Sequence, residues 1–244
     1  MSQVPALQRG IEIISKIAVS DYTYSQLESE MGIPKASFGR LMKCLLDNNF
    51  IVADKGSKLL RIGDNLMHLS MESYESSPVW RYGHESARKL SERWKITCVI
   101  HEHKEPFEIF WRVKSVPPGG INTRAVGFSM SSMNSNSQGQ LFLSQMPDLA
   151  IKDYFAAGQL RKASEFTIMD YDSMLVRIQE IRECGYALQE KENHAFMKQI
   201  SVPFKLPGDK GRFCMTAYMP LDFADVLPLR DNMLFEAARV GGIE

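Results

Sequence analysis

The residues of this sequence with the clearest chemical potential are basic ones that follow a glycine–proline turn. In the stretch MGIPKASFGRLMKCLLDNNFIVAD, which begins at Met31, the turn at residues 32–34 is followed by Lys35, Arg40 and Lys43. Such side chains on one side of a helix can reach phosphates and base edges in a DNA groove. The same pattern describes an ordinary amphipathic helix with a solvated side, so the flanking elements must decide between the two.

The charges of the chain are unevenly distributed although its formal net charge is zero. Residues 1–34 contain two basic and four acidic residues, a net charge of −2, whereas residues 35–61 contain six basic and two acidic residues, a net charge of +4. A small domain can therefore turn its basic segment toward phosphates while its acidic segment faces away.

The elements around the basic stretch have the order of a winged helix-turn-helix. Helical spacing of apolar residues predicts helices over 4–19 and 35–49. For the short helix between them, Ser25 is the predicted N-cap, Glu28 its capping-box partner and Gly32 its end. Two apolar runs on either side of residues 54–57 predict a β-hairpin. The predicted DNA-contacting residues are Lys35, Ala36, Ser37, Arg40, Lys43, Lys55 and Lys58.

The pattern changes after the hairpin. Asp64 is the predicted N-cap of a linker helix with unevenly placed apolar residues, which ends at the Ser-Ser-Pro of residues 76–78. Helices are then predicted over 79–94, 172–184 and 227–242, and strands within 95–116, 198–206 and 212–221, with a turn at 207–209. The fold class is therefore α+β. The predicted domains are a DNA-binding domain at 1–63, a linker helix at 64–77 and a second domain at 78–244.

A polar run in the second domain is suited to ligand binding. Residues 131–137 are rich in Ser and Asn and lead into apolar residues 141–143. Such a run can cap a helix, whose first N–H groups form a site for an anion or a carbonyl group. Polar groups above an apolar floor are what a small-ligand pocket requires. The alternative is a flexible loop beside a filled core.

Catalytic and metal chemistry is not indicated. His101 and His103 would share one side of a strand, but they lack a firm third ligand, so we interpret them as the solvated side of an antiparallel strand. The sequence contains no phosphate loop, dinucleotide-binding glycine motif or nucleophile elbow. We expect no catalytic residue, no metal and no cofactor.

The cellular setting is predicted from what the chain lacks. Its four cysteines form no C-x-x-C pair, so we expect them to be reduced and buried. No apolar stretch is long enough to span a membrane, and the N-terminus does not resemble a signal peptide. We therefore expect a cytoplasmic protein with no membrane partner.

Two motifs carry a resemblance over nearly the whole chain. The segment MGIPKASFGRLMKCLLDNNFI resembles the pattern G-L-P-K-S-T-x-Y-R-L-L, and IRECGYALQEKENHAFMKQISVPF resembles R-x-x-G-Y-A-x-D-x-E-E…C-I-A-A-P-V without gaps. With both in this order, the chain resembles an IclR-type transcriptional regulator. The resemblance implies a winged-helix domain, a linker helix and a GAF-like effector-binding domain. It also implies homodimers or dimers of dimers that bind near-palindromic operators and respond to small organic acids or aromatic metabolites.

The sequence departs from the family in the implied pocket. The pattern H-x-T-A-x-G-K-A falls on residues 134–141, so its lysine is Gln140 here. The family's aspartate is Gln189, its cysteine is Gln199, and the small hydroxyl residues fall on Thr216 and Tyr218. The predicted effector-binding residues are Asn134, Ser135, Asn136, Ser137, Gln140, Gln189, Gln199, Thr216 and Tyr218. Amides and a phenol suit a neutral or weakly acidic ligand.

Three functions fit these observations. The first is a sequence-specific DNA-binding regulator, acting as a dimer or a dimer of dimers, whose second domain senses a small carboxylate or aromatic metabolite. The second is a constitutive DNA-binding regulator whose second domain serves only dimerisation. The third is a small-molecule enzyme with an N-terminal domain used for assembly, which is disfavoured because the sequence contains no catalytic constellation.

Overall fold

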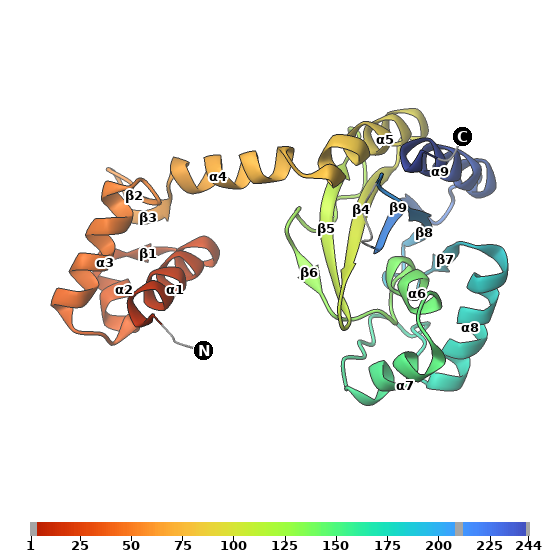
Figure 1. The fold of residues 1–244 in the computed structure, drawn as a ribbon, viewed down its shortest axis with the longest axis horizontal. Coiled ribbons are helices and arrows are strands. Elements are labelled where there is room, and N and C mark those ends of the chain that lie inside the picture. The colour runs from red at the N-terminus through yellow and green to blue at the C-terminus, as the bar shows by residue number, and fades with distance from the viewer. Residues whose placement is uncertain (1–3, 208–211, 243–244) are drawn as a thin grey trace. The chain divides into compact units, whose positions relative to one another are not determined.

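The computed structural model in Figure 1 describes residues 4–207 and 212–242. The chain divides into two compact units, residues 1–76 and 77–244. Each unit has its own hydrophobic core. The predicted turn at 207–209 lies largely outside the described residues.

Three helices form the body of the N-terminal unit. They are α1 (Pro5–Val19), α2 (Tyr24–Met31) and α3 (Lys35–Asp47), and all three were predicted. Their inward-facing residues, together with two from the strands, form one core: Ile13, Ile17, Leu27, Phe38, Met42, Ile51 and Leu60.

The wing has three strands, one more than predicted. β2 (Ile51–Ala53) and β3 (Leu59–Ile62) form the predicted hairpin, and β1 (Tyr22–Thr23) pairs antiparallel with β3. The predicted cap of α2 is wrong, because Thr23 and not Ser25 is the N-cap. The Thr23 hydroxyl accepts from the backbone N–H of Gln26, whose side chain accepts from the backbone N–H of Thr23, so Gln26 takes the place predicted for Glu28.

The last helix of this unit is α4 (Asp64–Glu75). Its N-cap is Gly63, and the predicted cap Asp64 is its first helical residue. A Cβ at position 63 would lie 2.2 Å from the backbone oxygen of Asn49, so the close approach of the two backbones requires glycine. No residue of this fully described helix is buried, and Met67 and Leu69 are more than half exposed.

A six-stranded antiparallel sheet forms the centre of the C-terminal unit, with strand order β6-β5-β4-β9-β8-β7. The strands are β4 (Thr97–Lys104), β5 (Glu108–Ser115), β6 (Ser129–Met130), β7 (Ala187–Glu190), β8 (Met197–Phe204) and β9 (Arg212–Pro220). The helices are α5 (Pro78–Trp94), α6 (Ser137–Ser144), α7 (Asp148–Ala156), α8 (Tyr171–Cys184) and α9 (Val226–Gly241). β6, β7 and α7 were not predicted.

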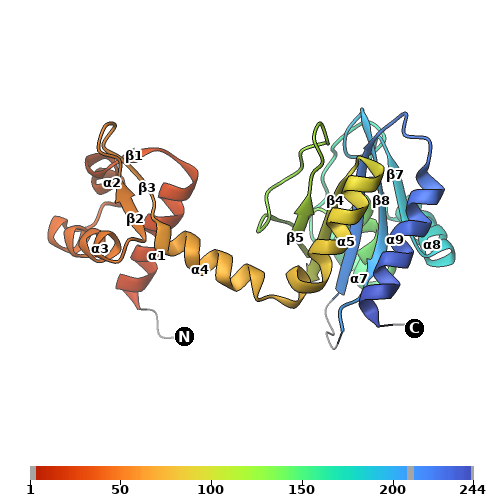
Figure 2. The same cartoon turned by 90° about the horizontal axis from the view of Figure 1, so that it is seen from above.

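The two sides of this sheet have different partners. Helices α5 and α9 lie side by side on one side (Figure 2), and α6 packs on the other, with α8 against it. A β-bulge between Ile100 and His101 shifts the pairing of β4 with β5. As a result Val113 belongs to the core under α5, whereas Trp111 faces the opposite core.

The expectation that the cysteines are buried holds for two of the four. Cys98 and Cys214 are buried as expected, but Cys44 and Cys184 are exposed, because each lies on the outward side of its helix. Among the residues that the structure describes, no helix is long and apolar enough to cross a bilayer.

The core of the N-terminal unit is tested by Phe38→Ala. Phe38 is fully buried, so the variant should lower the free energy of unfolding by about 3–5 kcal/mol. Urea denaturation followed by circular dichroism would measure the loss. Leu46→Ala on the same helix is the control, because Leu46 is 37% exposed and its loss should stay below about 1 kcal/mol. Equal losses in both variants would contradict the burial described above.

Candidate functional site

The turn between α2 and α3 presents α3 to solvent. Gly32 ends α2 in the left-handed region, at φ 59°, where glycine is favoured, and α3 begins directly after Pro34. Phe38 and Met42 face the core. The opposite side of α3 therefore remains available for another molecule.

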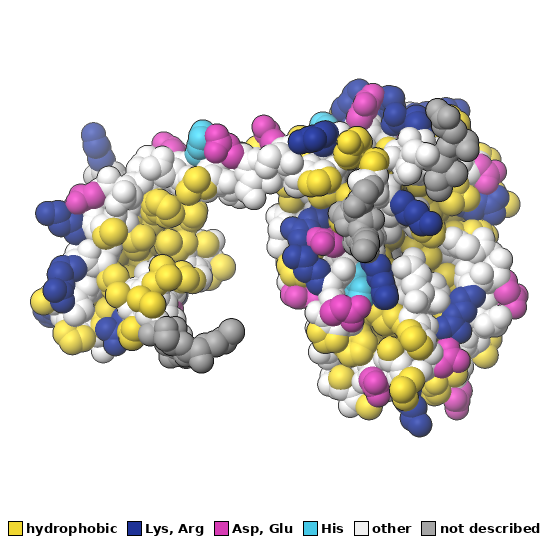
Figure 3. Space-filling model, in the orientation of Figure 1, with side chains coloured by type: hydrophobic (Ala, Val, Ile, Leu, Met, Phe, Trp, Pro, Cys, Tyr) yellow, Lys and Arg dark blue, Asp and Glu magenta, His cyan; other side chains and the backbone are white. Residues whose placement is uncertain are grey.

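The seven residues predicted to contact DNA lie on α3 and on the wing. Lys35, Ala36, Arg40 and Lys43 are exposed, Ser37 is half-buried, and Lys55 and Lys58 are exposed in the hairpin turn. Figure 3 shows basic side chains gathered along the side of the unit that α3 and the hairpin form. A helix and a hairpin that carry positive charge on one side match the geometry of a winged helix on a DNA duplex.

The positive charge of this surface is not neutralised within the unit. None of the five lysine and arginine side chains just named pairs with a carboxylate of a described residue. Arg61, by contrast, pairs with Asp21. Asp54, at the base of the hairpin turn, accepts from the Ser57 hydroxyl and from the backbone N–H of Ser57 and Gly56, and these bonds lower its pKa. This carboxylate therefore orders the turn and leaves Lys55 and Lys58 unpaired.

In the C-terminal unit the polar run is buried and caps α6, as the sequence indicated. Residues 134–137 are fully buried. The Asn136 side chain accepts from the backbone N–H of Gly139 at 2.8 Å and donates to the Ser132 oxygen at 2.8 Å. A Cβ at position 139 would lie 2.3 Å from the backbone oxygen of Met133, so the run packs directly on the first turn of α6.

Asn134 connects this run to the segment before α8. Its side-chain nitrogen donates to the backbone oxygens of Arg161, at 3.2 Å, and Ile168, at 3.0 Å. Its side-chain oxygen accepts from the Arg161 N–H at 3.1 Å and from the Tyr154 hydroxyl at 3.2 Å. The amide is therefore satisfied within the protein.

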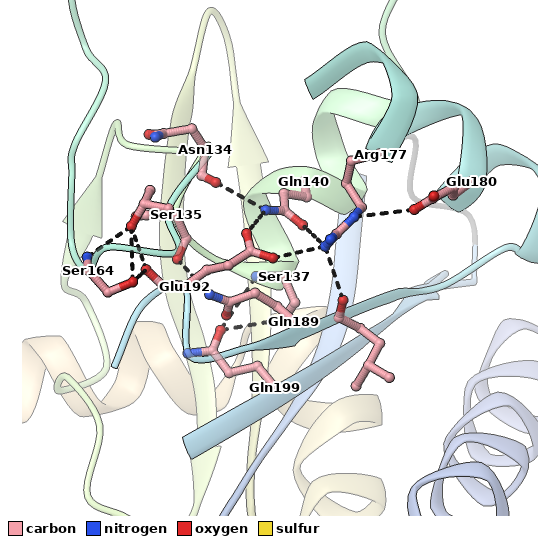
Figure 4. A network of polar contacts seen from close by, with 12 residues as sticks. Asn134, Ser135, Ser137, Gln140, Ser164, Arg177, Glu180, Gln189, Glu192 and Gln199 are labelled. Atoms are coloured by element: carbon pink, nitrogen blue, oxygen red, sulfur yellow. Dashed lines mark hydrogen bonds and ion pairs between the residues drawn. The ribbon is translucent and has the colours of Figure 1, made fainter. Parts of the chain in front are cut away.

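Gln140, which replaces the motif's lysine, binds a buried carboxylate (Figure 4). Its amide nitrogen lies 2.6 Å from one oxygen of Glu192, and Arg177 lies 2.9 Å from the other. Burial raises the pKa of Glu192, while Arg177 and Gln140 oppose the shift. The hydroxyls of Ser164 and Thr167 donate to the Glu192 backbone oxygen. These bonds link the loop before α8 to the loop after β7.

The remaining predicted residues join a network of hydroxyls and amides on β7, β8 and β9. Ser201 lies 2.8 Å from both the Ser137 and Thr216 hydroxyls. Gln199 accepts from the Ser137 N–H at 3.4 Å, and Gln189 donates to the Ser135 oxygen at 3.2 Å. The structure thus brings together residues far apart in sequence, but eight of the nine bond within the interior: Asn134, Ser135, Asn136, Ser137, Gln140, Gln189, Gln199 and Thr216.

The ninth, Tyr218, lines an open cleft of about 410 Å³. The buried end of the cleft is formed by Trp111, Gln138 and Tyr218, which are 3%, 1% and 3% exposed. Apolar side chains line much of the remainder: Ile121, Phe128, Met130, Phe196 and Met197.

Two residues at the buried end carry polar atoms that lack a hydrogen-bond partner in the part of the chain that the structure describes. The Trp111 indole N–H and the Gln138 side-chain oxygen are buried and have no hydrogen-bond partner among the described residues. The Tyr218 hydroxyl lies 3.2 Å from His101 Nε2 and accepts from the Gln138 amide at 3.3 Å. Unsatisfied buried donors and acceptors cost free energy, which a ligand with matching groups would recover.

The outer part of the cleft is positively charged. Arg124, Arg161 and His194 line it, and neither arginine pairs with a carboxylate within the described part of the chain. Burial, followed by the charges of Arg161 and Arg124, lowers the pKa of His194. A carboxylate entering the cleft would therefore meet two unpaired guanidinium groups.

Most residues of the cleft were not predicted. Gln138 directly follows the recognised polar run and could have been included with its neighbours. Arg124 and Arg161 lie outside helices and strands, so no periodicity indicates where their side chains point. Trp111 reaches the cleft because of the bulge, which a sequence pattern does not reveal.

The interpretation of His101 and His103 as a solvated pair is wrong. They do share one side of β4, but they are only 0% and 6% exposed, because that side packs under α6. His101 contacts Trp111 edge-to-face at 4.6 Å. Among the described residues, no group of three His, Cys, Asp or Glu side chains is placed to hold a metal ion.

Comparison with known proteins agrees with the motifs. Residues 114–205 match the family model described as the C-terminal domain of the bacterial transcriptional regulator IclR. The chain contains an IclR C-terminal domain. No curated protein sequence gives a significant match to the chain.

Solved structures of IclR regulators share the fold of the whole chain. The IclR regulator from Alicyclobacillus acidocaldarius has a TM-score of 0.80 at 18% identity, covering 99% of both chains. IclR from Thermotoga maritima has a TM-score of 0.81 at 18% identity, covering 98% of both. An IclR homologue from Microbacterium hydrocarbonoxydans, in complex with 4-hydroxybenzoate, has a TM-score of 0.81 at 15% identity, covering 96% of this chain and 97% of that one. The predicted fold, a winged helix-turn-helix followed by a GAF-like domain, is confirmed. The family model and the Alicyclobacillus acidocaldarius structure are both described as transcriptional regulators.

The buried end of the cleft should make stability pH-dependent. Burial lowers the pKa of His101 to about 3, whereas an unfolded histidine titrates near its ordinary value of 6.5. Below about pH 6.5 the His101 imidazole becomes protonated in the unfolded chain but stays neutral in the folded chain. The free energy of unfolding therefore falls as the pH falls. Between pH 6.5 and 5 this loss should reach up to about 2 kcal/mol.

Urea denaturation followed by tryptophan fluorescence would measure this slope, because Trp80, Trp94 and Trp111 all lie in the C-terminal unit. His101→Asn should flatten the slope. His68→Asn, an exposed substitution in α4, should leave it unchanged. If His101→Asn leaves the slope unaltered, His101 is not the source of the pH dependence.

Proposed function

We propose that this protein is a DNA-binding transcriptional regulator whose C-terminal domain binds a small organic anion. The observation that carries the first part is the unneutralised charge on α3 and the wing, placed where a winged helix meets a duplex. Arg40 would enter the major groove, with Ser37 at its edge and Ala36 near a thymine methyl group. Lys35 and Lys43 would clamp the groove through its phosphates. Lys55 and Lys58 would contact the flanking backbone. Such a regulator acts in the cytoplasm, where its DNA is found.

One such unit makes few contacts with DNA, so a twofold pair and a near-palindromic operator are needed for useful affinity. The surface of α1 supports a homodimer. Val4, Leu7 and Ile11 lie at helical spacing on one side of this helix and are 59%, 62% and 56% exposed. Burying such a row against a second copy would remove apolar surface from water. A dimer of dimers would be built from the same pair.

The cleft favours an aromatic or similarly flat carboxylate. Arg124 and Arg161 would receive the carboxylate, the apolar walls would hold a ring, and the unpaired atoms of Trp111 and Gln138 would bond to a polar group at the far end. The solved complex of an IclR homologue with 4-hydroxybenzoate supports a ligand of this size and chemistry.

A constitutive regulator is the second candidate. It is favoured by the closed network around Asn134 and Gln140, where side chains predicted to bind a ligand bond to one another. A ligand-dependent rise in melting temperature distinguishes the two candidates, since only a ligand that prefers the folded state stabilises it.

Arg40→Ala should weaken binding to the protein's operator by about 1–3 kcal/mol, because it removes a side chain proposed to contact bases. Fluorescence anisotropy would measure this with a duplex from upstream of the protein's own gene and an unrelated duplex, across a salt series. Arg88→Ala, on α5 in the C-terminal unit, is the control for loss of an exposed arginine. Unchanged affinity in Arg40→Ala would remove Arg40 from the interface.

For the cleft, 4-hydroxybenzoate should raise the melting temperature of the C-terminal unit, whereas its neutral analogue 4-hydroxybenzamide should not. Replacing Arg124 and Arg161 together by Gln should abolish the effect, because both proposed carboxylate partners are lost. Arg93→Gln, on α5, should preserve it. Equal stabilisation by acid and amide would contradict the proposed role of the two arginines, and the absence of any shift across a series of related acids would favour the constitutive regulator.

A further inference from the structure

Tyr24 is the first residue of α2 and lies against α3. Its ring meets the buried ring of Phe38 edge-to-face, with centroids 5.1 Å apart at 75°. Although the ring is held by this contact, Tyr24 is 39% exposed. Its hydroxyl has no hydrogen-bond partner among the described residues. The position of this hydroxyl is therefore set by packing of the ring, and its O–H group is free to donate a hydrogen bond to another molecule.

The hydroxyl of Tyr24 lies over Gly39. A Cβ at position 39 would meet the Tyr24 oxygen at 3.7 Å, and no other atom within 4 Å lies outside the immediate chain and helix backbone. Gly39 therefore leaves a space on α3 that a residue of α2 enters. In the family pattern G-L-P-K-S-T-x-Y-R-L-L, which the segment from Gly32 resembles, tyrosine stands at the position of Gly39. Here the phenol that reaches this place comes from a different helix.

The neighbours of Gly39 on α3 are basic. Lys35 and Lys43 stand four residues before and four residues after it, so the three positions form one row along the helix. Both lysines are exposed, and neither pairs with a carboxylate of a described residue. The Tyr24 hydroxyl thus reaches this row at Gly39, midway between the positions of the two lysines.

We propose that the Tyr24 hydroxyl, together with Lys35 and Lys43, binds one phosphate of the DNA backbone. This inference rests on the proposed DNA binding. A phosphate offers anionic acceptor oxygens, which suit a phenolic donor and two ammonium groups. In a helix-turn-helix the first helix crosses the backbone while the second lies in the groove, and Tyr24 belongs to the first. A phosphate contact positions the protein and carries no sequence information.

Tyr24→Phe tests the proposal, because it removes one oxygen and keeps the ring against Phe38. Anisotropy titrations across a salt series would use a duplex from upstream of the protein's own gene and a mixed-sequence duplex of equal length. The variant should bind both duplexes about tenfold more weakly or worse, since a hydrogen bond to a charged group is lost. The slope of log K against log salt should not change, because no charge is removed.

Two further variants make the result specific. Lys43→Gln should reduce the magnitude of that salt slope by about one, as loss of a single cationic contact requires. Tyr82→Phe is the matched control, since Tyr82 is also 39% exposed but lies on α5, and it should bind as the parent protein does.

Each remaining outcome has a distinct meaning. Parent-like affinity of Tyr24→Phe on both duplexes would overturn the inference and leave the proposed DNA binding intact. A loss confined to the duplex from the protein's own gene would also overturn it, because the hydroxyl would then read a base. Failure of the parent protein to bind either duplex at low salt would remove the proposed function and this inference with it.

Discussion

The C-terminal domain depends on one constraint, which is that a polar segment buried beneath α6 must satisfy its hydrogen bonds internally. Asn136 uses its side chain to start the helix, and Asn134 uses its own to hold the backbone at Arg161 and Ile168. The Glu192 carboxylate accepts hydrogen bonds from Gln140 and Arg177. These bonds place the segments that carry Arg161 and His194, which are also the segments that surround the cleft.

The N-terminal unit solves a different problem. It must keep like charges close together on one surface, which costs free energy unless an oppositely charged partner is present. The charges are placed on rigid elements, because α3 is fixed by Phe38 and Met42 and the hairpin turn is fixed by Asp54. Stability is thus supplied by the buried side of each element, and the opposite side, which carries the charges, is left exposed.

Sequence patterns predicted the elements much better than the site. Helices with long apolar periodicity, such as α3, α5 and α8, were found because burial of one side imposes that periodicity. β1 has only two residues, which is too short to show a pattern. The capping pair of Thr23 and Gln26 competed with an equally plausible pair two residues later, Ser25 and Glu28. The polar residues of 134–137 were recognised as special. Whether they face a ligand or one another depends on where the loops after α7 pass, and no local rule fixes that path.

The bulge in β5 has a consequence for observing this protein. It turns Trp111 toward the cleft, while the other two tryptophans, Trp80 and Trp94, are packed with the opposite core. An indole is sensitive to the polarity around it, and this one lies at the end of the cleft with its N–H unpaired. The domain therefore contains a natural optical reporter at the place where a small molecule would arrive, and occupancy can be followed in the unlabelled protein.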